Sequence, residues 1–203
     1  MLSYSTVESH TLELLKALMQ EELFSSLRLV GGTALALQYG HRQSVDLDMF
    51  GSAQLDTIEL RQNLSRLGKL TVIKETSYIK IYLLDGIKVD FVDYAYPWID
   101  DMVEENGIRL ASDKDIAAMK INAIEGRGSK KDFIDLYFLL QHYTLQEILD
   151  FYCCKYPENS LFRAVLSLSY FDDADAQMMP VMYVDSSWDS MKAYLADVVK
   201  SYK

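Results

Sequence analysis

The sequence predicts an α+β fold: a mixed β-sheet with flanking helices, followed by a helical C-terminal lobe. Three observations support this prediction. Between residues 27 and 94, short β-rich runs alternate with segments of helical apolar spacing. Asp85-Gly86 joins two of these runs as a two-residue hairpin turn. After Pro97 the β character fades, and capping residues followed by helical spacing continue along the rest of the chain.

The elements of the first lobe follow in chain order. Helices are expected over residues 6–24, 33–39 and 54–67, and Gly40 ends the second. Strands are expected over residues 27–30, 45–50, 69–75, 78–84 and 87–94. The result is a sheet of about five strands. The hairpin register pairs Lys80 with Phe91, which turns Lys80 away from Asp90.

The second lobe is predicted from its helix starts. Ser112 and Ser129 each stand three residues before an aspartate, which is typical of a capped helix. Helices are expected over residues 113–126, 133–143, 145–154, 161–170 and 188–203. A polar loop is expected at Asp172, Asp173 and Asp175. We therefore predict a sheet domain over residues 1–110 and a helical domain over residues 111–203.

The composition limits the class of protein. Half of the 203 residues are hydrophobic, yet no apolar run approaches the roughly 20 residues that span a bilayer. Residues 1–12 lack the basic region and apolar block of a signal peptide, and the adjacent Cys153 and Cys154 lack the spacing of a metal site. We expect a cytoplasmic protein without a membrane partner. The net charge of −10 makes any contact with nucleic acid local.

One stretch carries the strongest chemical signal. Gly31-Gly32 stands between a strand and a short helix, and a helix N-terminus of this kind can seat a phosphate. Asp46 and Asp48 follow on the next strand, two residues apart and so on one face. Side by side, these like charges favour a cation between them. The alternative interpretation is an edge strand with an acidic face toward solvent.

A third acid strengthens the metal interpretation. Asp90, on the strand after the hairpin turn, offers the further ligand that a two-metal phosphoryl-transfer site needs. Asp93 competes for that role, but it falls on the opposite strand face and nearer the strand end.

The order of these motifs resembles the polymerase-beta-like nucleotidyltransferase superfamily, and within it the AbiEii-like toxins of abortive-infection systems. The resemblance rests on four blocks, which are spread over most of the first 140 residues: residues 29–35, residues 40–48, Ala118-Met119-Lys120, and residues 127–137. Gly-Gly and Asp-x-Asp are each weak signals alone. All four blocks in the family's order are a specific match, and they imply a sheet of the nucleotidyltransferase type.

The resemblance implies roles for these residues. Asp46, Asp48 and Asp90 would hold Mg²⁺ on the triphosphate of an incoming NTP, and Asp90 would also help to deprotonate the acceptor's hydroxyl. Gly31, Gly32 and the amides that follow, starting with Thr33, would bind the β- and γ-phosphates. The helical lobe would close the site from the other side of a cleft.

Lys120 and Arg127 of the second lobe have two interpretations each. Lys120 lies on an otherwise apolar helix stripe, where a snorkelling lysine would keep its ammonium in water. The resemblance instead implies that Lys120 reaches the nucleotide phosphates. Arg127 can be a cation favoured near a helix C-terminus or a nucleotide contact. Arg42 is a candidate phosphate contact, whereas the neighbouring His41 is expected to be a solvated loop residue.

Two aspartates of the helical lobe are also candidates. Capping alone explains Asp132, the third residue after Ser129. Asp135 shares a face with apolar residues, and because a buried carboxylate needs a partner, Lys120 or Arg127 is expected to pair with it. The resemblance places both aspartates in the active site, Asp132 with the nucleotide and Asp135 among the catalytic residues.

The leading hypothesis is an Mg²⁺-dependent nucleotidyltransferase toxin. It would transfer a nucleoside monophosphate from an NTP to a tRNA or a protein, and a neighbouring gene would encode its antitoxin. Lys120, Arg127, Lys130 and Lys131 would offer phosphates a local basic site. One alternative is an enzyme that modifies a small molecule such as an antibiotic. Another is a non-catalytic nucleotide-binding module, which has no need to keep Gly31, Asp46, Asp48 and Asp90 together.

Overall fold

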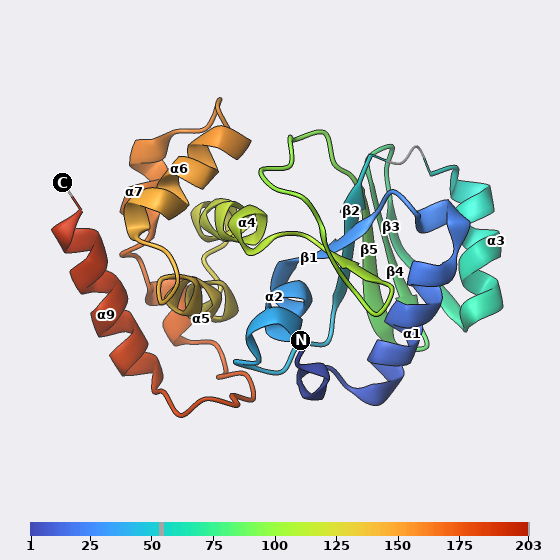
Figure 1. The fold of residues 1–203 in the computed structure, drawn as a ribbon, viewed down its shortest axis with the longest axis horizontal. Coiled ribbons are helices and arrows are strands. Elements are labelled where there is room, and N and C mark those ends of the chain that lie inside the picture. Colours follow the sequence, from blue (N-terminus) through green and yellow to red (C-terminus); the bar gives the residue numbers. More distant parts are fainter. Residues whose placement is uncertain (53–54, 203) are drawn as a thin grey trace. The chain divides into compact units, whose positions relative to one another are not determined.

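A computed structural model describes residues 1–52 and 55–202 (Figure 1). The chain forms two compact units that are interleaved in the sequence. The sheet unit comprises Met1–Gly40, Ser44–Ala95 and Met102–Ala111, and the helical unit comprises His41–Gln43, Tyr96–Asp101 and Ser112–Lys203. The chain therefore enters the helical unit for three residues directly after Gly40 and returns to the sheet unit at Ser44.

The sheet unit contains one mixed sheet, which confirms the α+β prediction. Its described strands are β1 (Arg28–Val30), β2 (Leu47–Gly51), β3 (Leu70–Glu75), β4 (Ile79–Leu84), β5 (Ile87–Asp93), β6 (Val103–Glu105) and β7 (Ile108–Leu110). They are ordered β3-β4-β5-β2-β1-β7-β6 across the sheet. The pairs β2–β5 and β1–β7 are parallel, and the remaining neighbours are antiparallel.

The prediction that β character fades after Pro97 is wrong. The hairpin of β6 and β7 adds two strands to the expected set, and Leu110 pairs with Leu29 of β1. Strands of three residues are too short to show alternation, but Asn106-Gly107 is a strong turn signal. Both turn residues have positive φ, 52° and 77°, as a two-residue hairpin turn of this type requires.

Helices of the sheet unit differ from prediction mainly at their ends. The segment expected as one helix over residues 6–24 contains η1 (Tyr4–Thr6), α1 (Ser9–Gln20) and η2 (Glu22–Phe24). The next helix, α2 (Gly31–Tyr39), begins at the glycine pair itself. The last, α3 (Thr57–Leu67), is capped by the carboxylate of Asp56, which accepts the amides of Ile58 and Glu59. The expected start of this helix at residue 54 lies outside the described residues.

The helical unit is built around α4 (Asp113–Gly126). Its other described helices are α5 (Lys130–Leu139), α6 (Leu145–Lys155), α7 (Leu161–Ser167), α8 (Asp172–Asp175) and α9 (Trp188–Ser201). Helices α5, α6 and α7 pack against α4, and α9 packs against α5 (Figure 1). The polar loop expected at residues 172–175 is wrong, because this segment forms α8 around the buried Ala174. The last helix was expected to end at residue 203, which lies outside the described residues.

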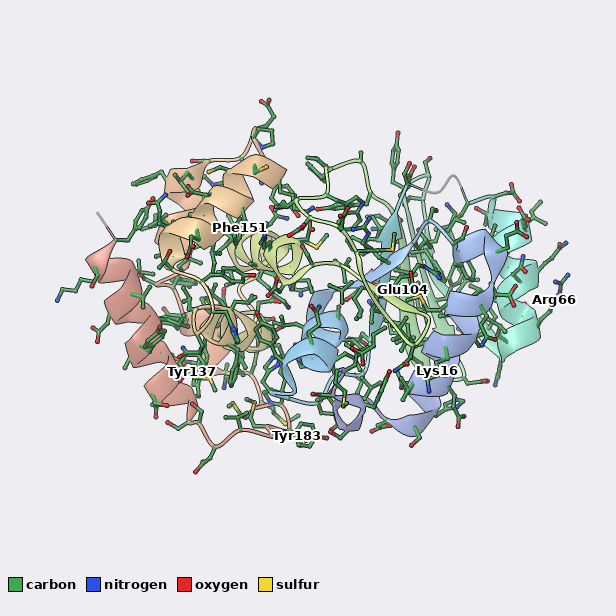
Figure 2. The ribbon with its side chains drawn as sticks, viewed as in Figure 1. Lys16, Arg66, Glu104, Tyr137, Phe151 and Tyr183 are labelled. Atoms are coloured by element: carbon green, nitrogen blue, oxygen red, sulfur yellow. The ribbon has the colours of Figure 1, made fainter. Side chains whose placement is uncertain are left out.

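Each unit has its own core. In the sheet unit, Leu29, Met49 and Phe91 bring β1, β2 and β5 together and are almost fully buried. In the helical unit, Ile121 of α4, Phe133 of α5 and Leu149 of α6 are buried. Nearer the surface, Tyr137 of α5 packs edge-on against the ring of Tyr194 from α9, with ring centroids 5.2 Å apart; Figure 2 labels Tyr137 among the side chains. No described helix combines the length and the apolarity needed to cross a membrane.

A charged pair also lies in the core of the helical unit. The Lys155 ammonium is 2.6 Å from Asp115 Oδ1, and both side chains are fully buried. Lys155 also donates to the Pro97 carbonyl at 2.7 Å and lies 4.6 Å from the centre of the Trp98 ring. The predicted cap at Ser112 is confirmed, since its hydroxyl oxygen accepts the Asp115 amide.

Candidate active site

The strand acids of the sheet unit are neighbours across two parallel strands. Asp48 of β2 is in register with Asp90 of β5, so both side chains leave the same face of the sheet. Asp46 precedes β2 by one residue, two positions before Asp48. Asp93 pairs with Gly51 and lies on the opposite face from Asp90, as predicted. Lys80 pairs with Phe91, also as predicted.

The glycine turn lies against this acidic pair. Gly31 has a φ of +68°, which L side chains rarely adopt, and a Cβ at this position would collide with the Asp48 carboxylate. The N-terminus of α2 is therefore beside Asp48. The glycine pair and the acidic strand, which are separated by a short helix in the sequence, are therefore in contact in the fold.

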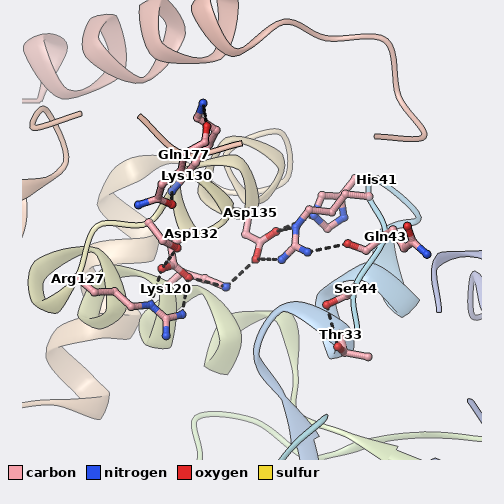
Figure 3. A network of polar contacts seen from close by, with 12 residues as sticks. Thr33, His41, Gln43, Ser44, Lys120, Arg127, Lys130, Asp132, Asp135 and Gln177 are labelled. Atoms are coloured by element: carbon pink, nitrogen blue, oxygen red, sulfur yellow. Dashed lines mark hydrogen bonds and ion pairs between the residues drawn. The ribbon is translucent and has the colours of Figure 1, made fainter. Parts of the chain in front are cut away.

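Thr33, in the first turn of α2, is buried and holds the chain that leads to β2. Its hydroxyl contacts the backbone carbonyl of Asp46 and lies 2.8 Å from the Ser44 hydroxyl (Figure 3). The Ser44 amide in turn donates to the Thr6 carbonyl at 2.9 Å. These contacts fix the position of Asp46 relative to α2.

Lysine already neutralises part of the acidic face. The Lys88 ammonium lies 2.6 Å from both carboxylate oxygens of Asp90. Side-by-side carboxylates repel unless positive charge is near, and oxygen donors of this kind suit a hard divalent cation. The carboxylate oxygens of Asp48, Asp90 and the nearby Asp46 are therefore donors of the kind that suit a divalent cation. Within residues 1–52 and 55–202, however, no three acidic, histidine or cysteine side chains are grouped as metal ligands.

The helical unit contains a buried network centred on Asp135. The Arg42 guanidinium forms two bonds to its carboxylate, Nε to Oδ1 and Nη2 to Oδ2, both 2.7 Å long. His41 Nε2 is 2.8 Å from Oδ1, and Lys120 Nζ is 2.6 Å from Oδ2. Figure 3 shows the His41 and Lys120 side chains next to Asp135. The predicted partnership of Lys120 with Asp135 is confirmed.

Asp132 is the second acid of this network. Lys120 Nζ lies 2.9 Å from its Oδ1, and Arg127 donates to both carboxylate oxygens, at 2.8 and 3.1 Å. The Ser129 hydroxyl donates to Oδ2 at 2.6 Å and makes no capping bond to the helix. The Asp132 carboxylate thus accepts hydrogen bonds from three side chains, so its contacts extend beyond capping of the helix.

The charges of the network shift the ionisation of its members. Burial opposes the charged form of Asp135, but Arg42 and Lys120 outweigh it, and the pKa lies well below the usual value. Burial likewise opposes the charged form of Asp132, and Lys120 with Arg127 lowers the pKa of that carboxyl. Burial would also lower the pKa of Lys120, yet Asp135 and Asp132 raise it. Asp135, Asp132 and Lys120 are therefore all charged around neutral pH.

The expectation that His41 is a solvated loop residue is wrong, because its side chain is fully buried. Of the two interpretations of Lys120, snorkelling does not hold, because the ammonium is enclosed with two carboxylates. Lys130 is buried too and contacts the backbone carbonyls of Asp175 and Gln177. Of the predicted basic site, Arg127 and Lys131 are exposed, Arg127 with 69% of its side chain accessible.

Comparisons with known proteins agree with this architecture. The chain matches a family model described as "Nucleotidyl transferase AbiEii toxin, Type IV TA system" over residues 13–194. It is 37% identical over 180 residues to the uncharacterized protein aq_aa25 of Aquifex aeolicus, and the match covers 86% of each chain.

Two solved structures share the fold. JHP933 from Helicobacter pylori has a TM-score of 0.56 at 18% identity, over 96% of this chain and 92% of that one. The antibiotic-resistance factor ANT(2'')-Ia also has a TM-score of 0.56, at 15% identity over 70% of this chain and 88% of that one.

Proposed function

Because this chain belongs to the AbiEii family of nucleotidyltransferases, we propose that it is a toxin that transfers a nucleoside monophosphate from an NTP to a macromolecular acceptor. The observation that carries this proposal is the contact between the glycine turn and the paired acids. Gly31 lies against Asp48, and Asp48 is in register with Asp90. This contact supports a phosphate seat and a cation site next to one another within the sheet unit.

Each sheet residue has a separate task in this proposal. Asp46, Asp48 and Asp90 would hold Mg²⁺, which would neutralise phosphate charge and lower the pKa of the attacking hydroxyl. The amides that open α2, at Gly31, Gly32 and Thr33, donate to the β- and γ-phosphates. Asp90 accepts the proton of the acceptor's hydroxyl, and pyrophosphate leaves in line with the attack.

The helical unit carries the remaining candidate residues. Arg127 is suited to bind phosphate because most of its side chain is exposed while Asp132 holds its guanidinium. Lys120 is buried between two carboxylates, so it acts by keeping Asp132 and Asp135 charged and in place. The network contains three cations, Arg42, Lys120 and Arg127, and two carboxylates, and this positive balance favours an anionic substrate.

The proposal is tested with labelled NTPs and the Asp48→Ala variant. Purified protein is incubated with Mg²⁺, each labelled NTP, and one of three acceptors: total tRNA, a bacterial protein extract or an aminoglycoside. We expect label on the tRNA or a protein with wild type, at least about 100-fold less with Asp48→Ala, and unchanged circular dichroism. Label on an aminoglycoside alone would contradict the toxin assignment. Equal inertness of both proteins with all acceptors would contradict the proposed transfer.

The biological role needs a second experiment. Wild type and Asp48→Ala are expressed in bacteria with and without the gene adjacent to the one that encodes this chain. We expect growth arrest with wild type alone, relieved by the neighbouring gene and absent with the variant. Unimpaired growth at matched expression levels would contradict a toxin role.

A further inference from the structure

Residues 41–43 are anchored in the helical unit through their backbone. The Gln43 amide donates to the Val181 carbonyl at 2.8 Å, and the Tyr183 amide donates to the His41 carbonyl at 2.9 Å. Arg42 pairs with Met182 as an antiparallel bridge between these two bonds. The chain on either side, up to Gly40 and from Ser44, belongs to the sheet unit. This three-residue segment therefore lies within the covalent link from α2 to the strand that carries Asp48.

The side chains of the segment are fixed by Asp135. Arg42 and His41, which is fully buried, supply three of the four nitrogen atoms that surround the Asp135 carboxylate within 2.8 Å. The remaining atom is Lys120 Nζ. The His41 ring also packs on Phe138, with ring centroids 4.7 Å apart. Two bonds in a parallel fork define the orientation of the guanidinium as well as its distance.

A carboxylate in this environment is poorly suited to accepting a proton during catalysis. Its side chain is fully buried, and each oxygen already accepts two of the four nitrogen atoms. Taking up a proton would place uncompensated positive charge in the core, which the low pKa of Asp135 also opposes. Asp135 is therefore not available as a general base.

We propose that Asp135 is a positioning residue, which holds Arg42 and His41 and thereby fixes the link between the phosphate-binding helix and the acidic strand. This inference rests on the proposed function for the roles of α2 and Asp48. Under it, Arg42 is a structural partner of Asp135 rather than a phosphate contact. The affinity for NTP and for the cation then depends on Asp135, although Asp135 touches neither.

The first test needs no catalytic activity. Hydrogen exchange of the full chain without nucleotide is compared for wild type, Asp135→Asn and Arg42→Lys. Lysine keeps the charge of Arg42 but cannot form the fork. We expect at least about tenfold faster exchange of the Gln43 and Tyr183 amides in both variants. The control is Arg163→Gln, which removes an exposed arginine paired with Glu125 of the same unit, and we expect no change there.

The second test separates positioning from catalysis. In a double-mutant cycle of Asp135→Asn and Arg42→Lys, we expect the double variant to lose no more affinity for NTP and Mn²⁺ than the worse single variant. The acidic limb of the pH profile of kcat should keep its wild-type position in Asp135→Asn. Three outcomes would each overturn the proposal: additive losses of affinity in the double variant, a shifted acidic limb of the kcat profile in Asp135→Asn, or hydrogen exchange at the wild-type rate at Gln43 and Tyr183.

An inert wild type would refute the proposed function, and the hydrogen-exchange experiment would still decide the role of Asp135. If Asp135→Asn does not fold, Arg42→Lys alone decides the exchange test.

Discussion

Gly31 lies so close to the Asp48 carboxylate that position 31 has no room for a Cβ. This contact places the start of α2 against the acidic strand. We predict that Gly31→Ala lowers kcat/KM at least about 100-fold, because both the positive φ and the approach to Asp48 are lost. Steady-state kinetics with NTP measures the effect. Gly126→Ala is the control, since a Cβ there meets nothing within 4 Å, and it should keep wild-type kinetics. Similar losses in both variants would contradict the argument.

Lys88 competes with a metal ion for Asp90, because its ammonium lies 2.6 Å from both carboxylate oxygens. We predict that Lys88→Met binds Mn²⁺ about tenfold more tightly than wild type, as titration followed by electron paramagnetic resonance would measure. Lys74→Met removes the same charge from an exposed position on β3 and should change the affinity less than twofold. Weaker Mn²⁺ binding in Lys88→Met would mean that the lysine helps to build the cation site.

Glu75 links stability of the sheet unit to pH. Bonds from Arg61 and Tyr82 lower the pKa of Glu75 to about 2. A carboxyl with a depressed pKa stabilises the fold above its unfolded pKa of about 4.3, and this contribution is lost as the pH falls toward 2. We predict that Glu75→Gln is less stable than wild type at pH 6 and that the difference shrinks steadily between pH 4.5 and 2. Urea unfolding followed by circular dichroism measures it. A difference independent of pH would contradict this assignment.

Lys155 balances the buried charge of Asp115, and breaking such a pair costs about 3–5 kcal/mol. We predict a loss of this size in the unfolding free energy of Lys155→Met. Both tryptophans of the chain, Trp98 and Trp188, belong to the helical unit, so their fluorescence during urea unfolding reports on this unit. Lys192→Met breaks a more exposed pair with Asp175 and should cost below about 1 kcal/mol. Equal costs would show that Asp115 is stabilised by other means.

Local signals predicted the features that depend on neighbouring residues. Asp85-Gly86 fixed the register of β4 and β5, and the alternation around Asp48 identified the face of β2. Asn106-Gly107 is an equally local signal for the β6–β7 hairpin, which was absent from the predicted strands. The strand expected over residues 45–50 begins at Leu47 instead, and Val45 before it is exposed.

The burial of His41 and Arg42 could not be predicted in the same way. Their partner Asp135 is more than 90 residues away along the chain, and no periodic pattern connects a loop histidine with a helix at that distance. Helical spacing placed Lys120 on an apolar stripe but could not distinguish a solvated ammonium from an ion pair. The Gly40-His41-Arg42 block of the family motif was the available signal for a role of this loop. The placement of the remaining candidates in one active site stays a prediction.

Because residues 41–43 belong to the helical unit, a single cut in the chain does not separate the two units for exchange between proteins. A cut at the predicted boundary near residue 110 would leave Asp135 without Arg42 and His41, its two partners from the link. Chimeras between family members should therefore exchange this tripeptide together with α5, even when every other junction is placed at position 110. The same reasoning predicts that Arg42 and Asp135 change together, rather than singly, wherever either one is replaced among relatives.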